Sequence, residues 1–206
     1  MKKLLLATLL AGTSILAMAN TAGLYVQGNI GVSKLEAKAD GEKFKDNNTG
    51  YTIAVGKDAG AVRYQADYTN FGKIEESGSD GVAGVAGYDE WDSVLKAQSL
   101  GVSAIYDFQT VSGFTPYAGV RVGVNQLKFE EDVRYSTIDL NGAYTVYSAN
   151  ESYKKTKVGA GVLAGVQYAI NPQLAVDAGV EYNYLGKLED TKLNQYGAKV
   201  GLRYNF

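Results

Sequence analysis

Bulky apolar residues alternate with small or polar residues along most of the chain, which is the two-residue period of a β-strand. In the segment PYAGVRVGVN, the side chains of Val120, Val122 and Val124 share one face, and Arg121 and Gly123 share the other. Eight segments have this pattern: LYVQGNIGV, YTIAVG, VRYQADYT, SLGVSAIYDF, PYAGVRVGVN, VGAGVLAGVQY, AVDAGVEYNY and VGLRYNF. The pattern therefore predicts eight strands, each with one apolar face.

The connections between these strands alternate in length. Three are short, around residues 57–60, 109–113 and 171–173, and four are long, at residues 35–49, 70–93, 126–155 and 185–194. Tight turns on one side and long loops on the other are typical of an up-and-down outer-membrane barrel. The predicted fold is all-β: an eight-stranded antiparallel up-and-down transmembrane β-barrel.

The chemistry of the two faces distinguishes a membrane barrel from a soluble β-sandwich. A sandwich keeps its apolar face inside, whereas a membrane barrel presents that face to lipid and turns its polar face to the lumen. Aromatic residues on the apolar face lie near strand ends: Tyr68, Tyr182, Tyr184 and Tyr196 on the loop side, and Tyr106, Tyr168, Tyr204 and Phe206 on the turn side. We expect these residues to form two aromatic girdles at the two membrane interfaces.

The chain begins with the features of a secretory signal peptide. Lys2 and Lys3 precede an apolar run over residues 4–16, and Ala17 and Ala19 form a small-x-small cleavage pattern. The run is shorter than the roughly 20 apolar residues that a spanning helix needs. Residues 1–19 are therefore expected to be a cleaved signal peptide, and residues 20–206 a single outer-membrane barrel domain.

The amino-acid composition excludes some kinds of catalytic and metal site. Histidine and cysteine are absent, which excludes catalysis by a histidine base and metal sites built from these two residue types. The 20 basic residues less Lys2 and Lys3 leave 18 against 22 acidic ones, so nothing favours a nucleic-acid partner. We expect no catalytic residue, no cofactor and no metal site.

Seven charged residues fall on the face predicted to line the lumen and are candidates for a polar network: Arg63, Asp67, Arg121, Asp177, Glu181, Lys199 and Arg203. Asp177 and Glu181 share that face four residues apart, and paired carboxylates can perform acid–base chemistry. They can also pair with the inward arginines and lysine, which cancels charge in a narrow lumen. We favour the second interpretation.

The long connections hold the remaining candidates. Residues 70–93 carry six acidic residues against one lysine, a net charge of −5, and include the only tryptophan, Trp91. This segment is either a binding patch or a solvated acidic loop with Trp91 at the membrane interface. Residues 126–155 are rich in tyrosine. An alternative partner for this segment is the phosphate of lipopolysaccharide, which its basic residues would bind: Lys128, Arg134, Lys154 and Lys155. The candidate loop binding patch consists of Trp91, Tyr88, Tyr135, Tyr144 and Tyr147.

Several segments resemble the opacity family of small porin-like outer-membrane proteins: LYVQGNIGVSKL, VRYQADYTNFG, LKAQSLGVSAIYDF, PYAGVRVGVN and GVLAGVQYAINPQLAVDAGVEYNYLGK. The final strand, whose outward face ends in Tyr204 and Phe206, also resembles the signal read by the barrel-assembly machinery. The resemblance implies a bacterial outer-membrane location, exposed loops used for adhesion or host-factor binding, and a lumen too full for a general pore. No loop motif transfers a partner-contacting residue.

The predicted function is that of a surface barrel whose long extracellular loops mediate adhesion or host-factor binding. Its expected partners are outer-membrane lipid and lipopolysaccharide, the barrel-assembly machinery, and a host surface or serum protein. Two alternatives stay open. One is a narrow conduit for small hydrophobic molecules, lined in part by Tyr25, Tyr117 and Leu163. The other is a purely structural barrel of the envelope.

Overall fold

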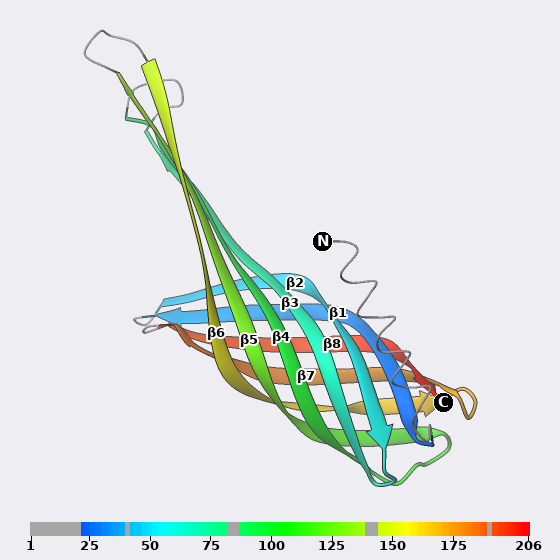
Figure 1. Ribbon diagram of the computed structural model, residues 1–206. Coiled ribbons are helices and arrows are strands. Elements are labelled where there is room, and N and C mark those ends of the chain that lie inside the picture. The colour runs from blue at the N-terminus through cyan, green and yellow to red at the C-terminus, as the bar shows by residue number, and fades with distance from the viewer. Residues whose placement is uncertain (1–21, 40–41, 82–86, 139–143, 189–190) are drawn as a thin grey trace.

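A computed structural model of the chain describes residues 22–39, 42–81, 87–138, 144–188 and 191–206. The predicted signal peptide lies outside these residues. Eight antiparallel strands form a closed barrel in chain order (Figure 1). They are β1 (Leu24–Ala39), β2 (Glu42–Asp58), β3 (Val62–Asp80), β4 (Asp89–Asp107), β5 (Phe114–Ile138), β6 (Tyr144–Ala169), β7 (Leu174–Leu188) and β8 (Thr191–Asn205). The described part of the chain includes no helix with the length and apolar character to cross a membrane.

The two faces of the barrel wall differ in chemistry. On β5, Val120, Val122 and Val124 are each more than half exposed, whereas Arg121 and Asn125 are buried. The exposed residues form the apolar outer surface, and the buried ones fill the lumen. The predicted eight-stranded antiparallel barrel is confirmed, because the pleat of each strand places alternate side chains on opposite faces.

The last strand closes the barrel by pairing with the first. β8 runs antiparallel to β1 along nearly its whole length, and the Phe206 amide donates to the Leu24 carbonyl oxygen at 2.9 Å. Tyr204 and Phe206 lie edge to face with ring centres 5.2 Å apart. Closure pairs the strand edges that would otherwise face lipid, where backbone groups have no water to bind.

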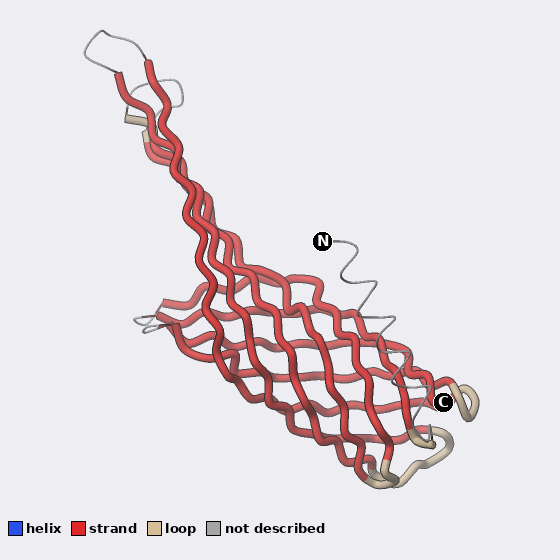
Figure 2. The backbone as a smooth tube through the Cα atoms, viewed as in Figure 1, coloured by secondary structure: helices blue, strands red, loops and turns tan. Residues whose placement is uncertain are grey.

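Strands β3 to β6 are much longer than the barrel wall requires. β5 and β6 contain 25 and 26 residues, whereas about 9–11 residues cross a bilayer as a tilted strand. Pairing of β3 with β2 stops at Asn70, and pairing of β6 with β7 stops at Ala160. Beyond these points the four strands continue together, away from the barrel (Figures 1 and 2). We call the paired residues of these four strands beyond the barrel, 73–80, 89–96, 128–138 and 144–154, the extracellular ribbon.

The prediction of long loops is therefore wrong for most of the residues involved. Residues predicted as loops at 70–93 and 126–155 are mainly strands of the ribbon, and those at 35–49 and 185–194 extend the β1–β2 and β7–β8 hairpins. The physical reason is that each strand keeps its antiparallel neighbour beyond the membrane, so the hydrogen-bond ladder continues outside lipid.

Candidate functional site

One buried ion pair links β3 to β5 across the lumen. Arg121 donates from Nε to Asp67 Oδ1 at 2.8 Å, and from a terminal nitrogen to Asp67 Oδ2 at 2.5 Å. The same guanidinium donates to the Ser99 hydroxyl at 3.1 Å. Gly101 and Gly123 leave the space that it fills, because a Cβ at either position would collide with it. Loss of either charged partner would leave the other buried and unpaired, which is costly.

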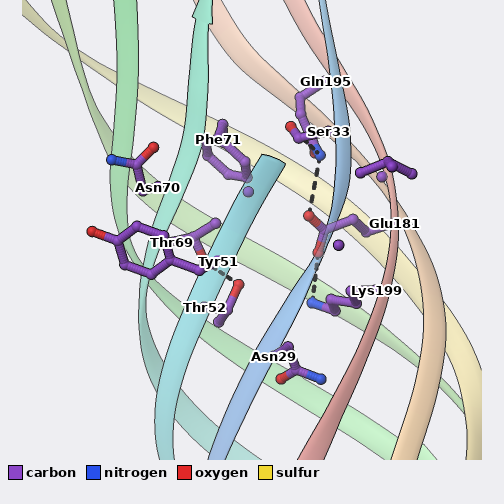
Figure 3. Close-up of a pocket in the computed structure, with 14 residues that line it drawn as sticks. Asn29, Ser33, Tyr51, Thr52, Thr69, Asn70, Phe71, Glu181, Gln195 and Lys199 are labelled. Atoms are coloured by element: carbon purple, nitrogen blue, oxygen red, sulfur yellow. Dashed lines mark hydrogen bonds and ion pairs between the residues drawn. The ribbon is translucent and has the colours of Figure 1, made fainter. Parts of the chain in front are cut away.

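A second ion pair joins β7 to β8 beside a small cavity (Figure 3). Lys199 donates to Glu181 at 2.6 Å. The Gln195 amide donates to Glu181 at 3.2 Å and to the Ser33 hydroxyl at 3.1 Å. The cavity has a volume of about 20 Å³, room for about one water molecule. This part of the lumen is filled by its own side chains.

Toward the turn side, two arginines are held by aspartates that the sequence analysis did not include. Arg63 donates twice to Asp107, at 2.6 and 2.9 Å, and Arg203 donates to Asp58 at 2.8 Å. The guanidinium carbons of Arg203 and Arg63 lie 3.9 and 5.8 Å from the Tyr25 ring centre. Asp58 and Asp107 continue the inward alternation of β2 and β4 by one step, and that continuation was the available signal.

Asp177 is not paired with a basic residue, contrary to the prediction. Its carboxylate is fully buried and accepts hydrogen bonds from Asn29 at 2.9 Å, Tyr117 at 3.2 Å and Gln167 at 3.3 Å. Within the described residues it makes no ion pair, and Lys199 pairs with Glu181 instead. The prediction that basic residues neutralise both carboxylates is therefore wrong for Asp177, because neutral donors satisfy its oxygens.

Apolar clusters also fill the lumen. One is formed by Ile105, Tyr117 and Leu163. A larger one consists of Leu35, Ala37, Phe71, Ile74, Ala97, Leu127, Leu185 and Leu193. Tyr25, Tyr117 and Leu163, considered above as the lining of a conduit, are all buried. The larger cluster was not predicted, because most of its members lie in segments predicted to be loops.

The extracellular ribbon has two faces of different chemistry. Cross-strand register places apolar side chains on the face that continues the lumen side, with Leu95, Phe129 and Tyr153 on one rung, Trp91 and Val133 on a second, and Tyr135 and Tyr147 on a third. The Phe129 and Tyr153 ring centres are 5.1 Å apart. Tyr135 and Tyr147 stack at 5.1 Å with their planes 15° apart. We call this face the aromatic face.

Acidic residues occupy other positions of the aromatic face: Glu76, Asp80, Asp89, Glu131 and Glu151. Asp80 is directly opposite Asp89, and Glu131 is directly opposite Glu151. Like charges in such pairs destabilise a sheet. In the described part of the chain, none of the five forms an ion pair. The aromatic face therefore combines exposed rings with uncompensated negative charge.

The opposite face of the ribbon, which we call the charged face, neutralises much of its own charge. Lys128 and Lys96 donate to Glu130, and these hydrogen bonds lower the pKa of Glu130 to about 2. Further out, Arg134 lies 3.8 Å from Glu90. Glu130 and Glu90 are thus paired with basic side chains, whereas Asp92 and Asp132 lie directly opposite each other on this face and form no ion pair within the described residues.

Three of the five candidate patch residues lie on one face. Trp91, Tyr135 and Tyr147 belong to the aromatic face, where they are 39%, 45% and 47% exposed. Tyr144 occupies the charged face by its register with Ile138, and Tyr88 directly precedes β4. The structure therefore groups three of these side chains and separates the other two.

The ribbon places Trp91 far from the lipid-facing wall. Trp91 is nine residues from Leu100, a lipid-facing residue of the same strand, or about 30 Å along β4. The alternative that seats Trp91 at the membrane interface is therefore wrong. Phe129 and Val133 were not predicted as members of this face, and Tyr153 was predicted only as one of the tyrosines of the long connection. The odd-numbered spacing of all three continues the inward alternation of β5 and β6.

Gly78 determines how the indole of Trp91 lies. Gly78 is directly opposite Trp91, and a Cβ at this position would collide with the six-membered ring of the indole. Replacing Gly78 by alanine is expected to push the indole into solvent and shift tryptophan emission to the red. Because the chain contains one tryptophan, the spectrum reports this site alone. The control is Ser79→Ala on the charged face, which should leave the emission unchanged. Gly87→Ala is not a suitable control, because Gly87 has a positive φ and alanine would strain the backbone there.

Comparison with known proteins identifies similar chains. The model of the opacity family porin proteins matches residues 55–206. Protein opa of Haemophilus influenzae is 36% identical over 155 residues, covering 74% of this chain and all of that protein. Opacity protein opA60 of Neisseria gonorrhoeae is 32% identical over 183 residues, covering 75% of this chain and 77% of that one. Neisserial surface protein A is 28% identical, with a TM-score of 0.60 over 90% of this chain and 98% of its own.

Proposed function

This chain belongs to the opacity family of outer-membrane porin-like proteins, and we propose that it is an adhesive surface barrel that binds a partner protein through its extracellular ribbon. The barrel wall fixes the protein in the bacterial outer membrane, and β3 to β6 carry the ribbon out of it. The partner is a protein of a host surface or of serum. Adhesion and capture of a soluble factor would use the same surface.

The observation that carries this proposal is the aromatic face. Trp91, Tyr135 and Tyr147 remain substantially exposed there. Removing a large apolar side chain from water is favourable by about 1.5–3 kcal/mol, so a partner that covers these rings gains free energy. Tryptophan and tyrosine are also the residue types that dominate protein interfaces. An ordered strand scaffold holds them, so binding does not require a flexible loop to become ordered.

The acidic residues of the aromatic face define the chemistry of the partner. The five unpaired acids repel one another, so a partner that brings lysine or arginine beside an apolar patch relieves this repulsion and buries the rings. Electrostatic complementarity of this kind mainly increases association rate and specificity. We therefore propose a basic protein surface with an apolar centre as the partner.

The lumen supports binding over transport or catalysis. Its carboxylates are held by Arg121, Lys199 or neutral donors, and the residues considered as a conduit lining are packed. We propose no catalytic role. Tyr204 and Phe206, at the end of the closing strand, are proposed to serve as the signal for the barrel-assembly machinery.

The test of the adhesive function removes the outer ribbon and leaves the barrel intact. Ile74 and Leu95 face each other on one rung, as do Phe129 and Tyr153. Replacing residues 75–94 and 130–152 by two short turns therefore keeps the register below the cut. Attachment of expressing bacteria to epithelial cells and capture of serum proteins are expected to fall to the level of cells without the protein.

Equal folded display is checked by heat-shifted electrophoretic mobility and surface labelling. As a matched control, the β7–β8 hairpin is shortened instead by joining Gly186 to Leu193, which are also register partners. That variant should attach like the intact protein. Undiminished attachment by the ribbon-shortened variant would exclude the ribbon as the adhesive surface.

A further inference from the structure

A rung of four lysines crosses the base of the ribbon on its charged face. Lys73 on β3 is opposite Lys96 on β4, which is opposite Lys128 on β5, which is opposite Lys154 on β6. These residues are far apart in the sequence, and only the strand register brings them side by side. Like charges directly opposite one another are destabilising in a sheet, so this arrangement calls for an anionic partner.

A second rung of lysines lies on β1, β8 and β7. Lys38 on β1 is opposite Lys192 on β8, and Lys192 is opposite Lys187 on β7. Together the two rungs place outward lysines on β1 and on β3 to β8. We call the seven residues the lysine ring: Lys38, Lys73, Lys96, Lys128, Lys154, Lys187 and Lys192.

Two β-bulges turn lysines outward into the ring. The register shifts between Asn70 and Gly72 on β3 and between Tyr184 and Gly186 on β7. Gly72 and Gly186 have φ angles of 94° and 122°, which only glycine adopts readily. Each shift reverses the alternation of inward and outward residues, so Lys73 and Lys187 lie on the outer face. Without the bulges, both lysines would lie on the lumen face.

The ring lies just beyond the lipid-facing wall. On β4, β5 and β6 one polar outward residue separates the last apolar residue from the lysine, as Gln98 separates Leu100 from Lys96. Four residues correspond to about 13 Å along a strand. This is the level at which a barrel wall meets the headgroups of the outer leaflet.

The acids near the ring compensate only part of its charge. Glu36 pairs with Lys38, Glu75 with Lys73, and Glu130 with both Lys96 and Lys128. Two acids thus serve one ring lysine each, and Glu130 is shared by two. In the described residues, no acid lies within ion-pair distance of Lys154 or Lys192.

We propose that the lysine ring binds the phosphate groups of outer-leaflet lipid headgroups, those of lipid A, and so fixes the height and tilt of the barrel in the membrane. Lysine binds phosphate as a compact point charge, and each lysine near an anionic lipid surface contributes about a fivefold factor in affinity. The proposal rests on the outer-membrane location and is independent of the adhesive function.

The test compares matched double variants for binding of bisphosphorylated lipid A to the folded barrel in neutral detergent, measured by native mass spectrometry. Lys154→Gln with Lys192→Gln removes two ring charges. Lys57→Gln with Lys155→Gln removes the same charge from the turn side and from the aromatic face. The ring variant is expected to bind about 25-fold more weakly, and the control variant like the unmodified protein. Lys154→Arg with Lys192→Arg should bind normally.

Three further arms decide the identity of the ligand. Lipid A stripped of its phosphates should bind the unmodified barrel as weakly as lipid A binds the ring variant. Glu130→Gln should strengthen binding, because it removes an acid that occupies Lys96 and Lys128. The ribbon-shortened barrel keeps every ring lysine and should bind lipid A while failing to attach to cells.

The proposal would be overturned by equal binding of phosphorylated lipid A to the ring and control variants. It would also fail if dephosphorylated lipid A bound as tightly as the phosphorylated form, or if inorganic phosphate at the same concentration displaced lipid A. The last result would indicate a general anion site in place of a headgroup site.

Discussion

Replacing Arg121 by alanine is expected to lower the free energy of unfolding by about 3–5 kcal/mol, the cost of leaving a buried charge without its partner. The Asp67 carboxylate would remain in the lumen without the three guanidinium hydrogen bonds that now hold it. The measurement is a urea titration of the barrel in lipid vesicles, with folded protein quantified by heat-shifted electrophoretic mobility.

Arg134→Ala is the matched control, because Arg134 is exposed and its nearest acid, Glu90, is 3.8 Å away. Exposed pairs of this kind contribute about 0–1 kcal/mol. The double variant Arg121→Met with Asp67→Leu should recover most of the lost stability, since it removes both charges and keeps the volume. If Arg121→Ala unfolds at the same urea concentration as Arg134→Ala, the lumen ion pair has no structural role.

The barrel could be predicted from the sequence because one physical rule determines it. The strand pleat puts alternate residues on opposite faces, so the valines of β5 and the inward Arg121 were assigned from their spacing alone. The closing role of β8 follows in the same way, because a membrane barrel cannot leave a strand edge in lipid. These features need no information about distant contacts.

The ribbon, the bulges and the ion-pair partners depend on information that a single strand does not contain. On β5, three consecutive acids at residues 130–132 interrupt the alternation that Leu127, Phe129 and Val133 otherwise continue. A bulge at Gly72 reverses the alternation and exposes Lys73. Arg63 pairs with Asp107 because β3 and β4 are neighbours in register, whereas spacing along the chain favoured Asp177 as strongly. Each of these features is a property of strand pairing.

The largest functional effect is expected from single substitutions on the aromatic face. Trp91→Ala is expected to reduce affinity for the partner at least about 30-fold, because truncation of a central aromatic residue typically costs 2 kcal/mol or more at an interface. Tyr135→Ala should have an effect of the same order, since it also removes the stacking partner of Tyr147. Each variant is purified and added in a dilution series, and its competition with bacteria that express the unmodified protein for attachment to epithelial cells is measured.

The control substitutions come from the other face of the same strands. Tyr144→Ala and Val146→Ala remove exposed apolar groups of the charged face, and their rungs are three positions and one position from that of Tyr147. If binding uses the aromatic face, these variants compete like the unmodified protein, whereas Trp91→Ala does not compete. Equal losses on both faces would mean that the ribbon acts only as a spacer, because a directional surface cannot be damaged equally from its two sides. Glu131→Gln with Glu151→Gln then tests the charge of the partner: it should weaken attachment and make it less sensitive to salt, since long-range attraction of a basic partner is screened within about 10 Å at 0.1 M ionic strength.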